Sequence, residues 1–192
     1  GQGNVVEQTT PLNHHEHFSY DHNSALVSHT NALGHKHRLI RDPNGNVQQS
    51  VDALGQHWRT GHNAKGQVTR QSNPLGESFD YEYNKLGLVS KVTNPLKQSW
   101  HYIWNHQGLL TAVRDNDGKH TRYSYNNDNQ LTRIYWPDGQ STQYKFDANG
   151  NCTAIKTPDG QVQRYEYNAL GLLTKHTDNS ARVTTYEYNG LS

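Results

Sequence analysis

The sequence has little of what most globular chains use to build a core. Its 192 residues include one cysteine and no methionine, and hydrophobic residues make up 31%, against roughly 45–50% in an average globular chain. With Cys152 alone, an internal disulfide is excluded. A natural reading frame begins with methionine, so we interpret a chain that starts at Gly1 and holds none as a processed or excised piece of a longer protein.

Charge is scarce as well. Charged residues make up 18% and the formal net charge is +1, whereas nucleic-acid binding needs a basic footprint on the protein. No apolar run approaches the ~20 residues that cross a bilayer, and no signal-peptide pattern is found. We therefore expect neither nucleic acid as a partner nor a membrane span.

Aromatic residues are present in unusual number. Twelve tyrosines and four tryptophans supply ring area, and the small net charge is not the large one typical of disordered chains. These features predict an all-β protein that packs aromatic rather than aliphatic side chains.

The chain is a tandem repeat. An Asn or Asp recurs at intervals of 21 residues without insertion or deletion, at Asp21, Asp42, Asn63, Asn84, Asn105, Asn126, Asp147, Asn168 and Asn189. A fixed period of this length is the signature of a repeat architecture. We interpret residues 1–192 as a single array of about nine repeats with no separate catalytic domain.

Glycine and proline keep the same period. Three residues after the Asx anchor lies one glycine column, with Ser24, Asn129 and Ser192 as its exceptions, and a second glycine column lies further on. Thirteen of the 16 glycines and five of the six prolines fall in this repeating pattern. Such residues mark tight turns, so each unit is predicted to contain two of them.

Aromatic pairs stand one and three residues before the anchor. This spacing places both rings on one face of a strand, and the residue between them is polar in six of seven pairs, so its face is predicted to meet water. The repeat signature comprises Tyr81, Tyr83, Asn84, Gly87, Tyr102, Trp104, Asn105, Gly108, Tyr123, Tyr125, Asn126, Tyr144, Phe146, Asp147, Gly150, Tyr165, Tyr167, Asn168 and Gly171.

Each unit therefore alternates strand and turn. In one unit we expect strands at 79–83 and 88–93, with turns at 84–87 and 94–97. Loops this short make consecutive strands antiparallel neighbours. The prediction is an all-β fold of about 18 strands, a continuous curved antiparallel sheet of tandem 21-residue hairpins.

Two features leave alternatives open. Apolar residues in the second strand, such as Leu131 and Ile134, are three apart, so either a β-bulge or a turn-capping role must reconcile them. The second and third repeats also lack the aromatic pair. Trp58, Phe79 and Trp100 each stand five residues before an anchor, and one interpretation is that they fill space where the usual pair is missing or offset.

The segment Tyr165-Glu-Tyr-Asn-Ala-Leu-Gly171-Leu-Leu173, with Pro158-Asp-Gly160 before it, resembles the YD repeat. This repeat belongs to bacterial Rhs polymorphic toxins, to the B and C components of Tc toxins and to teneurins. The resemblance covers essentially the whole chain. It implies an arc of a spiral β-shell, which in bacterial members encloses a toxic C-terminal domain and is commonly exported by the type VI apparatus or displayed at the cell surface.

The chain departs from the complete family pattern. Asp42-Pro43 is its only Asp-Pro pair and falls in a repeat turn, and the repeat continues to the last residue. Self-cleavage and toxicity are therefore assigned to no residue. The resemblance implies a non-catalytic wall segment of a secreted or cell-surface protein, with the rest of the shell and its enclosed toxin domain as partners.

Candidate sites have a plainer explanation in each case. His14, His15 and His17 cluster around Glu16 as metal ligands do, but a polar, histidine-rich solvent face is the favoured explanation. Asp117, Asp138 and Asp159 resemble paired catalytic carboxylates, yet each precedes a turn glycine. Cys152 occupies an apolar column, which favours packing over a nucleophilic role. We expect no catalytic residue, metal or cofactor.

Two further hypotheses follow from the rings and the strand edges. Exposed tyrosines flanked by Asn and Gln suit carbohydrate, so a glycan-binding or adhesion module is the alternative function. Packing of the rings on the sheet is the plainer account. Edge strands near Val5 and near 186–188 invite pairing with other chains, which predicts self-association.

Overall fold

The computed structural model describes residues 3–189, and within them it contains strands and turns but no helix. This confirms the all-β prediction. The strands are β1 (Glu7–Thr9), β2 (His15–Tyr20), β3 (Leu26–Thr30), β4 (Lys36–Arg41), β5 (Val47–Val51), β6 (His57–His62), β7 (Val68–Ser72), β8 (Ser78–Tyr83), β9 (Val89–Thr93), β10 (Ser99–Trp104), β11 (Leu110–Arg114), β12 (His120–Tyr125), β13 (Leu131–Tyr135), β14 (Ser141–Phe146), β15 (Cys152–Lys156), β16 (Val162–Tyr167), β17 (Leu173–Thr177) and β18 (Val183–Thr185).

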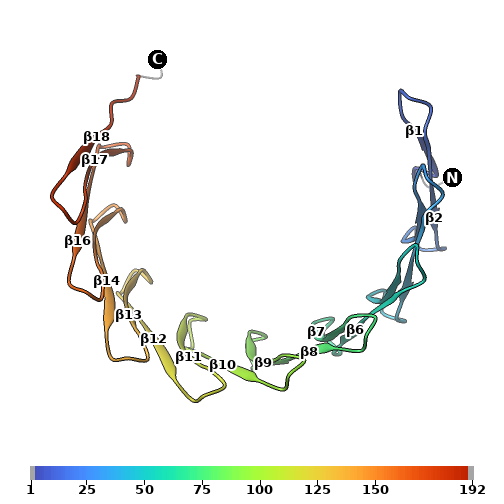
Figure 1. Cartoon of the computed structure of the whole chain (residues 1–192), viewed down its shortest axis with the longest axis horizontal. Helices are drawn as coiled ribbons and strands as arrows, with labels where there is room; N and C mark the ends of the chain where they lie inside the picture. Colours follow the sequence, from blue (N-terminus) through green and yellow to red (C-terminus); the bar gives the residue numbers. More distant parts are fainter. Residues whose placement is uncertain (1–2, 190–192) are drawn as a thin grey trace. The chain divides into compact units, whose positions relative to one another are not determined.

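The described residues divide into two compact units, each of which contains several of the 21-residue repeats. The first comprises Gly1–Tyr83 with Lys91–Ser99, and the second comprises Asn84–Ser90 with Trp100–Ser192. In the first, β1 to β8 pair antiparallel in chain order. In the second, β10 to β18 do the same (Figure 1). The predicted antiparallel pairing of consecutive strands is confirmed within each unit.

The Asx anchor builds the turn that follows it. The side-chain oxygen of Asn84 accepts hydrogen bonds from the backbone N–H groups of Leu86 and Leu88, at 2.9 and 3.0 Å. The N–H of Gly87 donates to the carbonyl of Asn84 at 3.0 Å, and Gly87 has φ of 79°. This is a type I turn closed by a left-handed residue, and it explains why an Asx begins it and a glycine ends it.

The left-handed conformation is required even where glycine is absent. Ser24 and Asn129, exceptions in the first glycine column, have φ of 64° and 62°. In the second column, Lys97 and Ala181 have φ of 65° and 61°. A side chain in this region costs roughly 1–2 kcal/mol, so the backbone of the repeat dictates the turn and the residue tolerates it.

A β-bulge reconciles the apolar residues that stand three apart. Between β12 and β13, Tyr123 lies opposite Ile134 and Tyr125 lies opposite Leu131, with a register shift between the two pairs. One extra residue on β13 brings Leu131 and Ile134 to the same side as the tyrosines. The same shift occurs in six other pairings of the described strands, so the bulge is the correct alternative.

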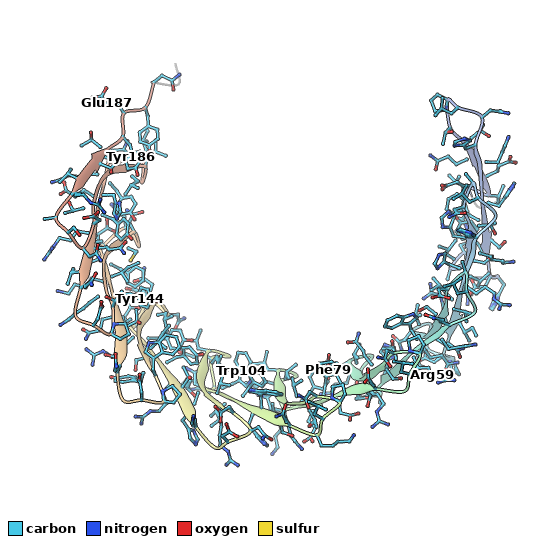
Figure 2. The ribbon with its side chains drawn as sticks, viewed as in Figure 1. Arg59, Phe79, Trp104, Tyr144, Tyr186 and Glu187 are labelled. Atoms are coloured by element: carbon cyan, nitrogen blue, oxygen red, sulfur yellow. The ribbon has the colours of Figure 1, made fainter. Side chains whose placement is uncertain are left out.

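The sheet has a ring face, which carries the aromatic pairs, and a polar face, which carries the residues between them. Tyr186 and Glu187, which follow β18, point to opposite sides of the chain (Figure 2). Of the seven residues that separate a ring pair, six are exposed, Ile103 among them, and Ser124 is half-buried. The prediction that this face meets water is confirmed for those six.

Neither face is closed into a core. Among hydrophobic residues of the described chain only Val51 and Ala112 are buried, at 3% and 8% exposure. Stable domains pack at least two layers, so one sheet leaves a face that another layer has to cover.

The edge strands differ slightly from those expected. Val5 precedes β1 and Tyr186 follows β18, so both lie outside the strands. The backbone N–H of Tyr186 nevertheless donates to the carbonyl of Thr174 at 2.9 Å.

Strands β8 and β9 each start one residue from the predicted position, at Ser78 and Val89.

Candidate functional site

The ring that immediately precedes the Asx anchor binds the backbone of the preceding repeat. The hydroxyl of Tyr83 donates to the carbonyl of Val68, fifteen residues earlier, at 2.6 Å. The same bond recurs at Tyr20–Val5, Tyr125–Leu110, Tyr167–Cys152 and Tyr188–Leu173, and the indole N–H of Trp104 replaces the hydroxyl at Val89. We call this recurring bond the ring clamp. In these six repeats it ties a hairpin to the bulge of the hairpin before it.

Burial raises the pKa of the hydroxyls of Tyr125 and Tyr167 above the ordinary value of tyrosine. Both phenols therefore remain protonated and able to donate at physiological pH. These tyrosines serve as structural donors, and nothing in their surroundings activates them as acids or bases.

Three repeats lack a ring donor at the clamp position. Arg41 substitutes with a guanidinium nitrogen 3.3 Å from the carbonyl of Leu26, and Phe146 has no polar atom to offer. The Nδ1 atom of His62 is buried without a hydrogen-bond partner among the described residues. The altered clamps thus include those of the second and third repeats, which the sequence marks as atypical, and that of the seventh, whose aromatic pair is present.

The bulge residue contributes a second recurring bond that the sequence analysis missed. The hydroxyls of Thr111, Thr132, Thr153 and Thr174 donate to the carbonyl of the residue between the paired rings, at 3.1–3.3 Å. These threonines are 21 residues apart, so the repeat period could have identified them as a conserved position of the repeat within this chain. Their role depends on the bulge, which the spacing alone left undecided.

A second set of Asx anchors was missed in the same way. Asp115 begins a turn, and its carboxylate accepts from the N–H groups of Asp117 and Lys119, at 3.0 and 2.8 Å. Equivalent turns begin at Asn31, Asp52, Asn73, Asn94 and Asp178. They follow the first anchors by ten residues, again with the period of 21.

The candidate carboxylates take part in turns. Asp138 accepts from the N–H of Gln140 at 2.9 Å, and Asp159 accepts from the hydroxyl of Thr157 at 2.5 Å. That bond from Thr157 is the main cause that lowers the pKa of Asp159. Asp117 contributes only its backbone N–H, to Asp115. The turn interpretation of these three residues is confirmed by their contacts.

The histidine cluster is spread over separate ion pairs. His15 lies 2.7 Å from Glu7, and His29 lies 3.1 Å from Glu16. Over residues 3–189, no three potential ligands converge as a metal ion requires. The structure thus gives these residues surface contacts, and His29 also stacks on Phe18 with ring centroids 4.8 Å apart.

Cys152 packs on the ring face opposite Phe146. Its thiol is half-buried, with Sγ 3.6 Å from the carbonyl of Ala154. Burial raises its pKa, which keeps the thiol protonated and weakens it as a nucleophile. The packing role expected from its apolar column agrees with this environment.

One hollow of the first unit has aromatic walls. It measures about 550 Å³, and its lining includes Trp58 and Phe79 with the small or polar side chains of Ser50, Thr60 and Gln71. Trp58 is 48% exposed and Phe79 is 43% exposed. Trp58 and Phe79 thus lie beside Thr60, one of the ring positions that holds no ring, and an open hollow remains between them.

The sequence profile of the teneurin YD-shell family matches residues 59–190. No curated protein matches the sequence. Among solved structures, the Photorhabdus luminescens Tc holotoxin pore superposes with a TM-score of 0.62 at 16% identity, covering 85% of this chain and 12% of that one. A TcdB2–TccC3–Cdc42 structure gives 0.63 at 16% identity, covering 88% and 12%.

These structures share the fold, and the present chain spans about 12% of their length. Among the described residues, no helix has the length and apolar character of a membrane span.

The profile match extends over more than half of the sequence and includes most of the ring pairs and anchors. The chain therefore belongs to the teneurin YD-shell family.

Proposed function

We propose that this chain is a non-catalytic wall segment of a YD-repeat shell that encloses a toxic domain until delivery. The observation that carries the proposal is the open ring face. Its aromatic pairs are half-buried, or exposed in the case of Tyr186 and Tyr188, and no second layer within either unit covers them. A further layer or an enclosed polypeptide would supply the missing cover.

The contacts of the repeat support a structural role. Among the signature residues, the Asx anchors and glycines form turns through backbone hydrogen bonds, and the hydroxyls of Tyr83, Tyr125 and Tyr167 clamp backbone carbonyls. Catalysis needs a reactive group with a perturbed environment and a partner. The raised pKa of the Cys152 thiol keeps it protonated, and the lowered pKa values of the Asp147 and Asp159 carboxylates make them weak bases.

The wider setting rests on relatives. Tc toxin structures with this fold contain both a TcdB2 and a TccC3 component. By analogy, we propose that the remaining shell and an enclosed toxin domain are the partners of this chain, and that it is a secreted or cell-surface protein. Export by a type VI apparatus is the bacterial route consistent with that proposal.

Electron microscopy of the longer protein that carries this chain tests the role. The proposal predicts a hollow particle with a wall one sheet thick and with density enclosed inside it. A compact solid body or an open filament would contradict the proposal, because neither leaves a lumen on which the ring face can close.

A second candidate function is carbohydrate binding, which the aromatic hollow favours. The rings of Tyr125 and Tyr167 are half-buried and their hydroxyls hold the backbone. Trp58 and Phe79 are instead exposed beside hydroxyl and amide groups, an arrangement suited to stacking on a sugar ring.

A glycan array separates the two functions. If the hollow binds sugar, Trp58→Ala with Phe79→Ala abolishes the signal, whereas Trp136→Ala, which removes an exposed ring outside that hollow, preserves it. No binding to any glycan, or equal loss in both variants, counts against carbohydrate recognition and leaves the wall role unaffected.

A further inference from the structure

Strands β14, β15 and β16 carry a second hollow, in the other unit and on the polar face. It measures about 500 Å³. Three cationic side chains and no carboxylate line it, and the lining comprises Gln143, Lys145, Thr153, Ala154, Lys156, Val162 and Arg164. None of these positions belongs to the ring pairs or the turn anchors.

The strand register explains why the three cations surround one point. Lys145 and Arg164 lie on either side of Ala154 in the same row of the sheet, and neighbouring strands are ~4.8 Å apart. Lys156 stands two residues beyond Ala154 on the same face, opposite Gln143. The methyl group of Ala154 therefore forms a low floor between three long basic side chains.

The protein supplies no counter-charge at this hollow. Among residues 3–189, four lysine or arginine side chains pair with carboxylates, and none of them is Lys145, Lys156 or Arg164. On the polar face of these strands the acidic residue is Glu166, and it lies 2.8 Å from the ammonium group of Lys175. All three cations are exposed, so their charges repel one another without a neutralising group between them.

We propose that this hollow binds a saccharide that carries a sulfate or phosphate group. The guanidinium of Arg164 offers paired donors and the two lysines add point charges, which together match a tetrahedral oxyanion. Gln143 and Thr153 lie where sugar hydroxyls can bond to an amide and a hydroxyl. The hollow is also within the ~300–1000 Å³ typical of small-molecule sites, larger than a bare oxyanion requires.

The residues that line the hollow favour an anionic saccharide over nucleic acid as the ligand. Single-stranded nucleic acid is bound by aromatic side chains on which the bases stack, beside a basic groove. No aromatic residue lines this hollow. A compact anionic sugar fits the available groups better than a polynucleotide.

Calorimetric titration of the 192-residue chain tests the proposal. The probes are one disaccharide in sulfated, phosphorylated and unsubstituted forms, together with single-stranded DNA of matched charge. We expect one or both anionic sugars to bind, and the unsubstituted sugar and the DNA to bind roughly tenfold more weakly or not at all. The two anionic forms distinguish a sulfated source from a phosphorylated one.

Paired variants locate the site. Lys156→Gln with Arg164→Gln is expected to weaken binding roughly tenfold or more. Lys36→Gln with Arg38→Gln removes the same charge from exposed positions of β4, away from this hollow, and is expected to preserve affinity. Lys145→Gln alone provides an independent variant if the first pair lowers the melting temperature.

Several outcomes would overturn the proposal. They are the absence of binding by either anionic sugar, equal binding by the unsubstituted sugar, equal or tighter binding by the DNA, and equal loss of affinity in both paired variants. None of these results bears on the wall role, because that role concerns the ring face.

Discussion

The phenolic oxygen of Tyr83 donates a hydrogen bond of 2.6 Å to the carbonyl of Val68, fifteen residues earlier in the chain. Val68 lies at the register shift between β6 and β7, opposite His62. The clamp therefore joins three consecutive strands at the irregular point of the sheet. It gives the tyrosine before each Asx anchor a polar function in addition to the packing of its ring.

Removal of the clamp is expected to lower stability without a change of fold. Tyr83→Phe keeps the ring and deletes the donor, so the free energy of unfolding should fall by about 1 kcal/mol. The reciprocal variant Phe146→Tyr supplies a hydroxyl where the repeat lacks one and should raise it by a similar amount. Urea denaturation followed by circular dichroism measures both. Equal stabilities for Tyr83→Phe and the native chain would show that the clamp contributes nothing.

Glycine at a strained turn is expected to stabilise the chain. Lys97 adopts φ of 65° in a column that otherwise favours glycine, so Lys97→Gly should add up to about 1 kcal/mol. The matched control, Gly118→Ala, places a side chain at φ of 80° and should destabilise the chain by a similar amount. Thermal melts of the two variants should shift in opposite directions. A decrease for Lys97→Gly would contradict the argument from backbone strain.

The turn aspartates predict how stability depends on pH. The side-chain amide of Asn151 is the main cause that lowers the pKa of Asp147, followed by backbone N–H groups of the same turn. A lowered folded pKa gives stability that is present above the unfolded value of about 4 and is lost as the pH falls below it. Melting temperatures should therefore drop below about pH 4.

Asp147→Asn tests that dependence directly. The variant retains the oxygen that accepts the turn bonds, so the loss of stability between neutral and acidic pH should be smaller than in the native chain. Asp128→Asn is the control, because Asp128 contributes its backbone N–H to a turn that Asn126 anchors. An identical acid transition in all three proteins would exclude the turn carboxylates as its cause.

Self-association of the 192-residue chain is expected through its strand edges or its ring face. Strand β18 has three residues, all exposed, and Tyr186 and Tyr188 beyond it are 40% and 48% exposed. Sedimentation at about 100 μM should show dimers or larger species. Tyr186→Lys with Tyr188→Lys should weaken association at this edge. A monomer across the whole concentration range would refute the expectation.

Much of the fold could be predicted from the spacing of a few residue types. Asn84 and Gly87 specify a turn by their own chemistry, and the ring pair specifies which side of the strand is apolar. These are local properties, so a single repeat contains them. The period then extends them to the remaining units.

The parts that escaped prediction depend on register. The bond from Tyr83 to Val68 and the meeting of Lys145, Lys156 and Arg164 both require the strand alignment that the bulge sets. A one-residue change of register exchanges the faces, and the three-residue spacing of Leu131 and Ile134 left the bulge undecided. The exposure of Trp58 was missed for a related reason, since it depends on small neighbours from adjacent strands.

The proposed wall role requires that the ring face of this sheet is enclosed in the longer protein. Thiol labelling with a bulky maleimide tests it, with Tyr144→Cys reporting the ring face and Lys145→Cys the polar face, each in a Cys152→Ser background. Labelling of the Tyr144→Cys protein should slow sharply from the isolated chain to the longer protein, while labelling of the Lys145→Cys protein should change little. Equal labelling rates for Tyr144→Cys in the two settings would contradict it.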